Sequence, residues 1–325
     1  MRAVVFTGAG GPEVVSLEER EDPLPGGREI LVSVTHAGLN PADLNQRAGR
    51  HPAPPGSPPD VPGLEVAGTV IGRGPAARRW SEGDAVFGIV GGGGLADRVL
   101  VDEDHVTEIP PNLDAVSAAA APEAFVTAHD AIFSQAGLRL GETLLVNGAN
   151  GGVGSAGVQL AKAAGAAVIA GIRSEGRREA LAELGAEVAV GPDELGAAVK
   201  RAGGVDVVLE LVGAPNLDAD IDALALLGRI VIVGTGAGTE AQLALRKLMA
   251  KRARIFGTGL RNRTAAEKAA AVTGFAHAVV PLLRDGRAAP PIDRVFPVRD
   301  VVAAFDHLER PGKFGKVLIE FGPGG

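Results

Sequence analysis

The chain of 325 residues contains no cysteine and no tyrosine. The lack of cysteine excludes disulfides, thiolate nucleophiles and cysteine-ligated zinc together. The lack of tyrosine means that no tyrosine hydroxyl serves as a proton donor. No window of 18 apolar residues predicts a membrane span, and the opening residues MRAVVFTGAG lack the apolar core of a signal peptide. We therefore expect a cytoplasmic protein with no membrane partner.

The charge balance is acidic, with 39 aspartates and glutamates against 32 lysines and arginines and a net charge of −7. A general nucleic-acid binder needs a basic face that displaces counterions, so this class is excluded. Hydrophobic residues make up 46% of the chain, which indicates a globular protein. The length exceeds one ordinary domain, and we predict two.

The most informative segment spans residues 141–178. A short apolar run, Thr143 to Val146, leads into a turn with glycines at 148, 151, 152 and 154, and an alanine-rich helical pattern follows. This order is typical of a strand, a phosphate-binding loop and a helix, in which unpaired N–H groups and the helix dipole face a pyrophosphate. Such a glycine pattern also serves packing alone, but a second strand pattern, Ala166 to Ile172, stands at the distance that a βαβ unit requires. We predict a dinucleotide site.

The residues after this second strand favour NADPH as the cofactor. A site for NAD carries an acidic residue here that holds the ribose hydroxyls. This chain has Arg173, Ser174 and Arg177 instead, which suit a 2′-phosphate. The alternatives are that these arginines are the solvated start of the next helix, or that Glu175 supports NAD. A carboxylate at Glu175 is also favoured simply by its position in a helix first turn.

The pattern of predicted strands and helices changes along the chain. The first hundred residues alternate short β-rich runs with glycine and proline, which predicts a mostly antiparallel β-domain. Six apolar runs between residues 144 and 257 then alternate with helical patterns, as in a parallel sheet covered by helices. A helical pattern over 264–286, a β segment, a helix over 300–309 and a strand over 316–320 close the chain. We predict domain limits of 1–117, 118–263 and 264–325, with the outer two segments forming one catalytic domain.

Several segments together resemble the zinc-independent NADPH:quinone oxidoreductase (zeta-crystallin-like) branch of the medium-chain dehydrogenase/reductase superfamily. The matching segments follow the family's order: GLNPADLNQRAG at 38–49, PGLEVAGTV at 62–70, NGANGGVG at 147–154, GRIVIVG at 228–234, GTGLRNRTAAEKAA at 257–270 and GKFGKVLIE at 312–320. The resemblance implies an α/β fold, with a doubly wound six-stranded parallel Rossmann sheet inserted into a mostly β, GroES-like catalytic domain. It also implies NADPH as the hydride donor and a homodimer joined through the Rossmann sheets.

The same resemblance separates this chain from the superfamily's zinc alcohol dehydrogenases. Those enzymes carry a zinc-binding cysteine where Asn40 stands and a zinc-binding histidine where Leu64 stands. Without a Lewis acid an alkoxide lacks its usual stabilisation. When a quinone or an enone is reduced, the negative charge that forms is delocalised and needs less stabilisation, so we expect no metal.

The resemblance implies three catalytic candidates, Asn40, Asp43 and Thr127, each with a structural alternative. An amide at Asn40 can donate to an oxygen that gains negative charge, or Asn40 simply forms an Asn-Pro turn. Asp43 is either part of the site or a helix-start cap. Thr127 either approaches the nicotinamide end of the cofactor or bonds its own helix backbone. His129, two residues on, we interpret as structural.

The expected cofactor contacts combine the glycine loop, the 2′-phosphate residues and two outlying positions. They are Asn147, Gly148, Asn150, Gly151, Gly152, Val153, Gly154, Arg173, Ser174, Arg177, Gly234 and Lys316. Arg261 and Arg263 either reach the cofactor or lie on an ordinary surface. The chain departs from its relatives at Pro192 and His51, where many of them carry tyrosine.

We therefore expect an NADPH-dependent reductase of quinones or related activated enones. Two alternatives stay open: a 2-enal or enoyl-thioester reductase on the same scaffold, and a non-catalytic NADPH-binding redox sensor.

Overall fold

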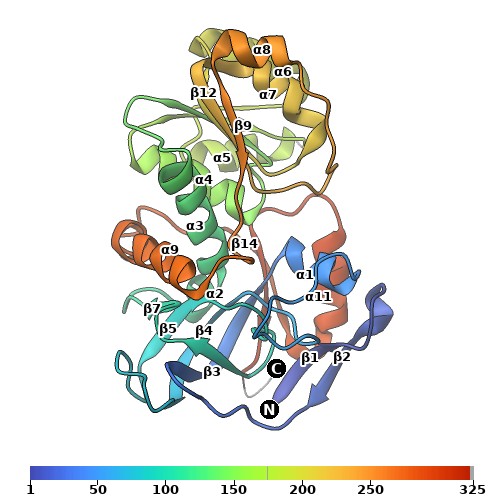
Figure 1. Ribbon diagram of the computed structural model, residues 1–325, viewed down its shortest axis with the longest axis vertical. Helices are drawn as coiled ribbons and strands as arrows, with labels where there is room; N and C mark the ends of the chain where they lie inside the picture. The colour runs from blue at the N-terminus through green and yellow to red at the C-terminus, as the bar shows by residue number, and fades with distance from the viewer. Residues whose placement is uncertain (174, 323–325) are drawn as a thin grey trace. The chain divides into compact units, whose positions relative to one another are not determined.

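The computed structural model describes residues 1–173 and 175–322 as two compact units (Figure 1). One unit comprises Met1–Val126 and Arg261–Gly325, and we call it the split unit. The other, Thr127–Leu260, is the inserted unit. The predicted limits, at 117/118 and 263/264, lie nine residues before the first of these boundaries and three residues after the second.

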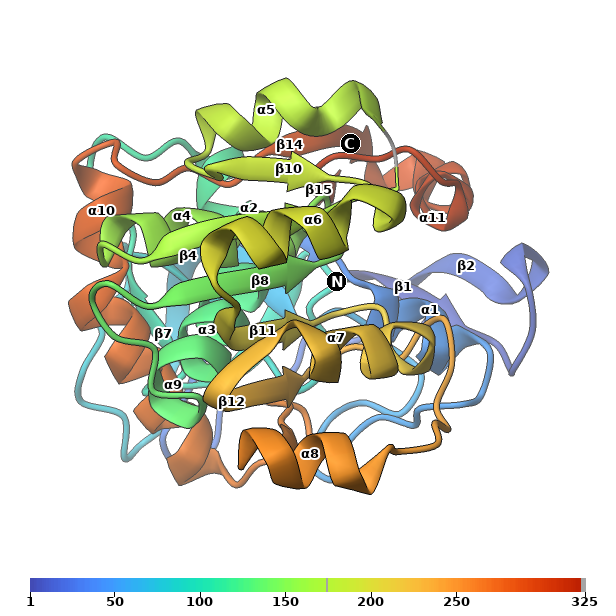
Figure 2. The same cartoon turned by 90° about the horizontal axis from the view of Figure 1, so that it is seen from above.

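The inserted unit contains the six-stranded sheet that the sequence predicts. Every neighbouring pair is parallel. The strand order is that of the doubly wound dinucleotide-binding fold, with β8 and β11 on either side of the point where the order reverses. Figure 2 shows β10, β8, β11 and β12 in succession across the sheet. In spatial order the strands are β10 (Val188–Val190), β9 (Ala167–Gly171), β8 (Thr143–Asn147), β11 (Val205–Glu210), β12 (Leu224–Ile232) and β13 (Arg254–Gly257).

Helices of the inserted unit pack against this sheet, as the α/β pattern requires. α4 contacts β8 and β9, α5 contacts β10, and α7 and α8 contact β12. Buried residues from strands and helices, such as Leu145, Ile169 and Ile221, form one apolar core. The helices are α4 (Gly152–Ala163), α5 (Arg178–Glu183), α6 (Pro192–Ala202), α7 (Leu217–Ala223), α8 (Leu245–Lys251), the 3₁₀ turns η3 (Glu175–Arg177) and η4 (Ala214–Asn216), and the π-helical segment η2 (Asp130–Gln135), which follows α3 (Pro122–His129).

The split unit contains the predicted β-domain. Neighbouring strands of its larger sheet are antiparallel except for β14 and β15. Along β3 the side chains of Ile30, Val32 and Val34 are buried and alternate with more exposed ones, because one face of the strand packs on the core. The strands in spatial order are β14 (Ile292–Pro297), β15 (Lys316–Glu320), β3 (Glu29–Leu39), β4 (Glu65–Arg73), β5 (Ala85–Ile89) and β7 (Val106–Glu108), with β6 (Arg98–Asp102) paired to β3 and a separate pair β1 (Arg2–Phe6) and β2 (Val15–Glu19).

The long helix predicted over 264–286 is two helices in the structure. α9 ends at Ala278, and a new helix begins at Val280 with a proline in its first turn. Pro281 has no N–H to continue the α9 hydrogen bonds, which explains the break. The helices of the split unit are α1 (Pro41–Arg47), α2 (Ala115–Ala120), α9 (Ala265–Ala278), α10 (Val280–Arg284), α11 (Val301–Glu309) and the 3₁₀ turns η1 (Pro12–Val14) and η5 (Val298–Asp300). Among the described residues, no helix combines the length and the hydropathy needed to cross a bilayer.

Candidate functional site

The glycine loop joins β8 to α4 in the inserted unit. Gly148 adopts φ +80°, a conformation that side chains other than glycine rarely take. A Cβ on Gly154 would lie 2.4 Å from the carbonyl oxygen of Gly148 and 2.7 Å from the Cα of Ala149. The helix therefore starts against its own loop only because these two positions carry no side chain.

The first turn of α4 offers backbone donors to a ligand. Within the described residues, the N–H groups of Gly152, Val153 and Gly154 have no protein acceptor, as expected for the start of a helix. Gly151 occupies the N-cap without a side chain to bond them. The Oδ1 atom of Asn150 is buried without a partner too, but as an acceptor it does not belong to this set of donors. This bare, positively polarised cradle fits the diphosphate of a dinucleotide.

Asn147 has a different environment from the rest of the loop. Its Nδ2 atom donates to Glu210 Oε2 and to Asp220 Oδ1, both at 2.6 Å. Asn147 and Glu210 end the adjacent strands β8 and β11 and are direct register partners. Glu210 Oε1 also accepts from the N–H groups of Val212 and Gly213. The Asn147 amide therefore connects the loop to a buried pair of carboxyl groups.

Asp220, on α7, is the carboxyl of this pair that holds a proton at neutral pH. Its side chain is fully buried, and burial together with the neighbouring Glu210 raises the pKa of Asp220 to about 8. Glu210 accepts hydrogen bonds from four N–H donors, those of Asn147, Val212, Gly213 and Asn216. Because Asp220 keeps its proton, the pair carries at most one negative charge.

We expect the Asp220→Asn substitution to reduce the pH dependence of stability. The folded chain keeps a proton on Asp220 that the unfolded chain has released above pH 4, so wild-type stability falls as pH rises towards 8. The variant loses the contribution of Asp220 to this slope, up to about 1.4 kcal/mol per pH unit between pH 5 and 8, while the other buried carboxyl groups keep theirs. Urea unfolding followed by circular dichroism at pH 5.5 and 7.5 measures it. Asp222→Asn, at an exposed position on the same helix, is the matched control and should keep the wild-type slope. An unchanged slope in Asp220→Asn would contradict a proton held on Asp220 in the folded chain.

The residues expected to hold a 2′-phosphate follow β9. Arg173 is exposed, and Arg177 is half-buried in η3. Ser174 lies outside the described residues. Arg178 forms an ion pair with Glu194, so it belongs to the contacts between α5 and α6. Pro192, one of the departures from the family pattern, starts α6.

Gly234 lies beyond the end of β12. A Cβ there would stand 2.3 Å from the carbonyl oxygen of Leu211, so the chain passes too close for any other residue. Its N–H donates to the Glu210 carbonyl. This close approach lies at the carboxyl edge of the sheet, next to the chain that follows β11.

In the split unit, the Asp43 side chain caps the start of α1. Asp43 accepts from the N–H of Asn40 at 2.8 Å and from the N–H of Gly63 at 3.1 Å. Full burial raises the pKa of Asp43 to about 6, although these donors and the nearby Lys316 and Arg261 oppose the shift. The cap expected of Asp43 is present, and its catalytic role stays a prediction.

The side chain of Asn40 is held by the protein on both ends. Its Nδ2 atom donates to Glu65 Oε1 at 2.9 Å and to the Gly38 carbonyl at 3.3 Å. Its Oδ1 atom accepts from Lys316 Nζ at 2.5 Å. Donation to an acceptor oxygen therefore requires the longer bond, to Gly38, to give way.

Lys316 forms a buried ion pair at the start of β15. Its ammonium lies 2.5 Å from Glu65 Oε1 and 3.0 Å from the Leu39 carbonyl, and both charged side chains are at most 4% exposed. The phosphate contact expected of Lys316 stays a prediction, and in the structure its donors point to protein oxygens. Glu65 Oε2 also accepts from the N–H of Glu123 at the start of α3.

Glu123 is a second protonated carboxyl. Burial and the negative charge of Glu65 raise its pKa to about 8. Thr127 lies one turn further along α3 and is buried. Its approach to the nicotinamide stays a prediction.

The sequence reasoning missed Glu65, Glu123, Glu210 and Asp220. A signal existed for two of them, because Glu65 and Glu210 each interrupt an apolar run, Glu65 at the start of β4 and Glu210 at the end of β11. Asp220 and Glu123 stand in ordinary helical patterns, so only the fold reveals that Asp220 is buried and that Glu123 lies against Glu65. Arg261 lies in the split unit and donates to Gln46, which connects the start of α9 with α1.

Comparison with known proteins gives matches to both units. Residues 26–111 match the family model described as alcohol dehydrogenase GroES-like domain, and residues 152–274 match the one described as zinc-binding dehydrogenase. Quinone oxidoreductase of Rattus norvegicus is 32% identical, and that of Homo sapiens 31%, each over 98% of this chain and 97% of the relative. The solved structure of a thermostable alcohol dehydrogenase from Pyrobaculum aerophilum is 33% identical with a TM-score of 0.84, covering 98% of this chain and 99% of that one.

Proposed function

Because this chain belongs to the quinone oxidoreductase family of the medium-chain dehydrogenase/reductase superfamily, we propose that it is an NADPH-dependent, zinc-independent reductase of quinones or related activated enones. Family membership makes the chain an oxidoreductase that uses a nicotinamide dinucleotide. One observation carries the proposal further: three unpaired N–H groups at the start of α4 form a cradle for a diphosphate.

The proposed reaction adds one hydride and one proton to a quinone and yields a hydroquinone. The nicotinamide, when bound, supplies the hydride, so the protein's part is positioning and electrostatics. The loop from Gly148 to Gly154 holds the diphosphate. Asn40, whose Oδ1 atom is held by Lys316, exchanges its Nδ2 bond to the Gly38 carbonyl for one to the acceptor oxygen as charge develops there. Solvent supplies the proton.

NADPH rather than NADH is supported by the residues after β9. The two residues directly after β9 are Ile172 and Arg173, so no acid stands there, and Arg173 is exposed. We expect Arg173→Ala combined with Arg177→Ala to weaken NADPH binding at least about tenfold while NADH binding changes little, because only NADPH carries the 2′-phosphate. Fluorescence titration with both nucleotides measures the difference. Equal losses for the two nucleotides would contradict the assignment.

Activity without zinc is supported by the side chains at the family's metal positions. Asn40 offers an amide and Leu64 a buried hydrocarbon in place of the ligands of the zinc enzymes. The Lys316 ammonium already lies on Asn40 Oδ1 and Glu65 Oε1. A second cation at these oxygens would be repelled by the first.

A steady-state screen tests the proposal. NADPH oxidation is followed with 1,4-benzoquinone, 9,10-phenanthrenequinone, simple enones and crotonyl-CoA as acceptors. The assays are repeated on protein dialysed against a chelator, to test whether activity needs a metal. Turnover of a quinone or enone is expected, and failure with all of them refutes the reductase. Preference for crotonyl-CoA would favour the enoyl-thioester alternative, and tight NADPH binding without any turnover would favour the redox sensor.

The expected partners remain proposals as well. A homodimer is supported by apolar side chains left exposed beside the end of the inserted sheet, among them Leu245 and Met249 on α8. The cytoplasmic location and the absence of nucleic-acid and membrane partners stay predictions from composition.

A further inference from the structure

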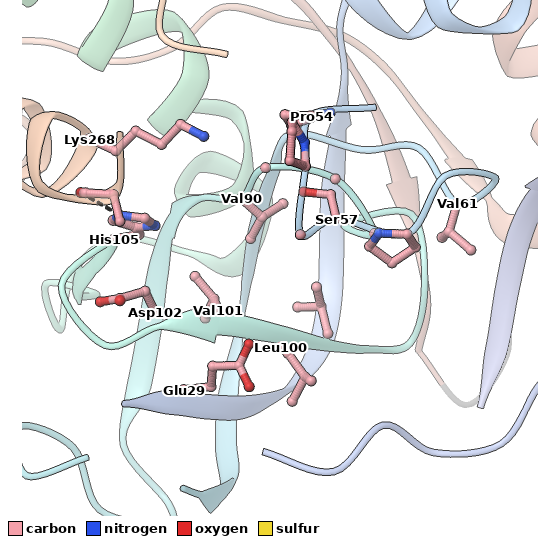
Figure 3. A pocket seen from close by; sticks show the side chains of 18 of the residues that line it. Glu29, Pro54, Ser57, Val61, Val90, Leu100, Val101, Asp102, His105 and Lys268 are labelled. Atoms are coloured by element: carbon pink, nitrogen blue, oxygen red, sulfur yellow. Dashed lines mark hydrogen bonds between the residues drawn. The ribbon is translucent and has the colours of Figure 1, made fainter. Parts of the chain in front are cut away.

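The split unit contains a cavity of about 810 Å³ that is lined by Arg261 but by none of Asn40, Asp43, Glu65 and Lys316. Its walls come from the proline-rich loop at 54–58, the glycine run at 91–93, β6 and the start of α9. Figure 3 shows Pro54, Val90, Val101 and Leu100 around it, with Lys268 at one end and Glu29 and Asp102 at the other. The walls are mainly apolar, and the charges are divided between the two ends.

The end beside α9 is basic. Lys268 is half-buried, and burial lowers the pKa of its ammonium. Within the described part of the chain, the Lys268 ammonium has no carboxylate within ion-pair distance. Arg261 also lines the cavity, and its Nε and Nη1 atoms are buried without a hydrogen-bond partner. Unpaired donors of this kind are costly unless a ligand satisfies them.

The nearby acids do not balance these two cations. Asp43 and Glu123 face Arg261, and Glu123 faces Lys268. Both oxygens of Asp43 already accept backbone N–H groups, and Glu123 is mostly protonated at pH 7. Glu65 is bonded to Lys316. One positive charge at this end therefore has no ionised partner.

Arg261 is held firmly in place by its third nitrogen. Nη2 donates to Gln46 Oε1 at 2.7 Å and to the carbonyl oxygens of Pro52 and His51 at 3.0 and 3.3 Å. The guanidinium thus anchors the proline-rich loop through Nη2, and its Nε and Nη1 atoms stay available to a ligand. Two other charged side chains have local roles: Glu267 caps α9 through Thr264, and Arg98, which also lines the cavity, pairs with Asp22.

Space beside Lys268 is kept open by a glycine. A Cβ on Gly91 would lie 2.5 Å from Ser57 Oγ, 3.7 Å from Pro54 Cγ and 3.8 Å from Lys268 Nζ. The ammonium and the hydroxyl therefore flank a point where the chain has no side chain. An ammonium, a hydroxyl and a guanidinium around one opening suit an oxyanion.

We infer that the basic end of this cavity, at Lys268 and Arg261, binds an anionic group carried on a flat apolar acceptor, such as a carboxylate or sulfonate on a quinone or enone ring. The inference rests on the proposed function and narrows its substrate class. The apolar walls accommodate the ring, and the two cations take the acid group. A phosphate of the cofactor is the other source of such an anion, and the experiments below distinguish it.

The first experiment compares 1,4-naphthoquinone with its 2-sulfonate in wild type, Lys268→Gln and Lys268→Arg. The ratio of kcat/KM for the sulfonate to that for the neutral quinone should fall about tenfold in Lys268→Gln, since one charge-assisted contact is lost. Lys268→Arg should keep most of it. Lys200→Gln, which removes the same charge from an exposed position on α6, should leave the ratio unchanged. A ratio that stays within twofold in Lys268→Gln overturns the inference.

The second experiment needs no turnover and so separates this inference from the proposed function. Calorimetry measures naphthalene-2-sulfonate, the neutral naphthalene-2-sulfonamide and 2′,5′-ADP binding to wild type and Lys268→Gln. The inference predicts that only the sulfonate binds about tenfold more weakly to the variant. Equal affinity of wild type for sulfonate and sulfonamide overturns it, as does a comparable loss of 2′,5′-ADP binding, which would assign the cations to the cofactor. If wild type reduces neither quinone, the proposed function fails while this experiment still decides the anion site.

Discussion

Replacing Lys316 with methionine should destabilise the split unit by about 3–5 kcal/mol. The ammonium is 4% exposed, and Glu65, its partner at 2.5 Å, is fully buried. Methionine fills a similar volume but leaves the Glu65 carboxylate buried without a cation. Denaturant unfolding followed by the fluorescence of Trp80, the single tryptophan and a core residue of the same unit, measures the loss.

Two further variants make this result specific. Lys313→Met removes a lysine three residues earlier that is only half-buried and bonds to the Arg310 carbonyl, so we expect a loss below about 1 kcal/mol. Adding Glu65→Gln to Lys316→Met should recover much of the lost stability, since the uncompensated charge disappears. A loss below about 1 kcal/mol in Lys316→Met itself would show that the ion pair does not hold the cluster together.

A carboxylate at Gly151 should weaken nucleotide binding strongly without harming the fold. Gly151 is the N-cap of α4, with φ −78° and ψ 170°, a conformation that aspartate adopts readily. In Gly151→Asp the carboxylate accepts the N–H groups of the first turn, which changes stability by less than about 1 kcal/mol. The same carboxylate repels and displaces the diphosphate, so NADPH affinity should fall at least about 100-fold, or about 2.7 kcal/mol.

The matched control is Gly151→Ala. A Cβ at this position meets only the Gly148 carbonyl oxygen, at an ordinary 3.7 Å. NADPH affinity should therefore stay within a few-fold of wild type in calorimetric titrations. Similar affinity in Gly151→Asp and wild type would mean that the diphosphate lies elsewhere.

Local patterns predicted the inserted unit well because each signal there is short-range. Apolar runs fix the six parallel strands, and the spacing of Gly148, Gly151 and Gly154 fixes the turn that ends β8. The same reasoning failed at α9, where a continuous apolar pattern concealed the effect of Pro281 on helix hydrogen bonds.

The charged clusters could not be predicted from the sequence because their members lie on segments that are far apart along the chain. Lys316 meets Asn40 and Glu65 only after β15 pairs with β3 and β3 with β4. Asn147, Glu210 and Asp220 converge only because β8 and β11 are neighbours in the sheet. Lys268 stands in an ordinary helical pattern, and only the cavity gives its ammonium a role.

Calorimetric titration of the folded chain with NADPH and, separately, with NADH shows whether the bare amides at the start of α4 hold a dinucleotide. We expect saturable binding of NADPH with one site per chain, weaker binding of NADH, and strong weakening of both in Gly151→Asp. Absence of binding of either nucleotide to folded wild-type protein would contradict this expectation.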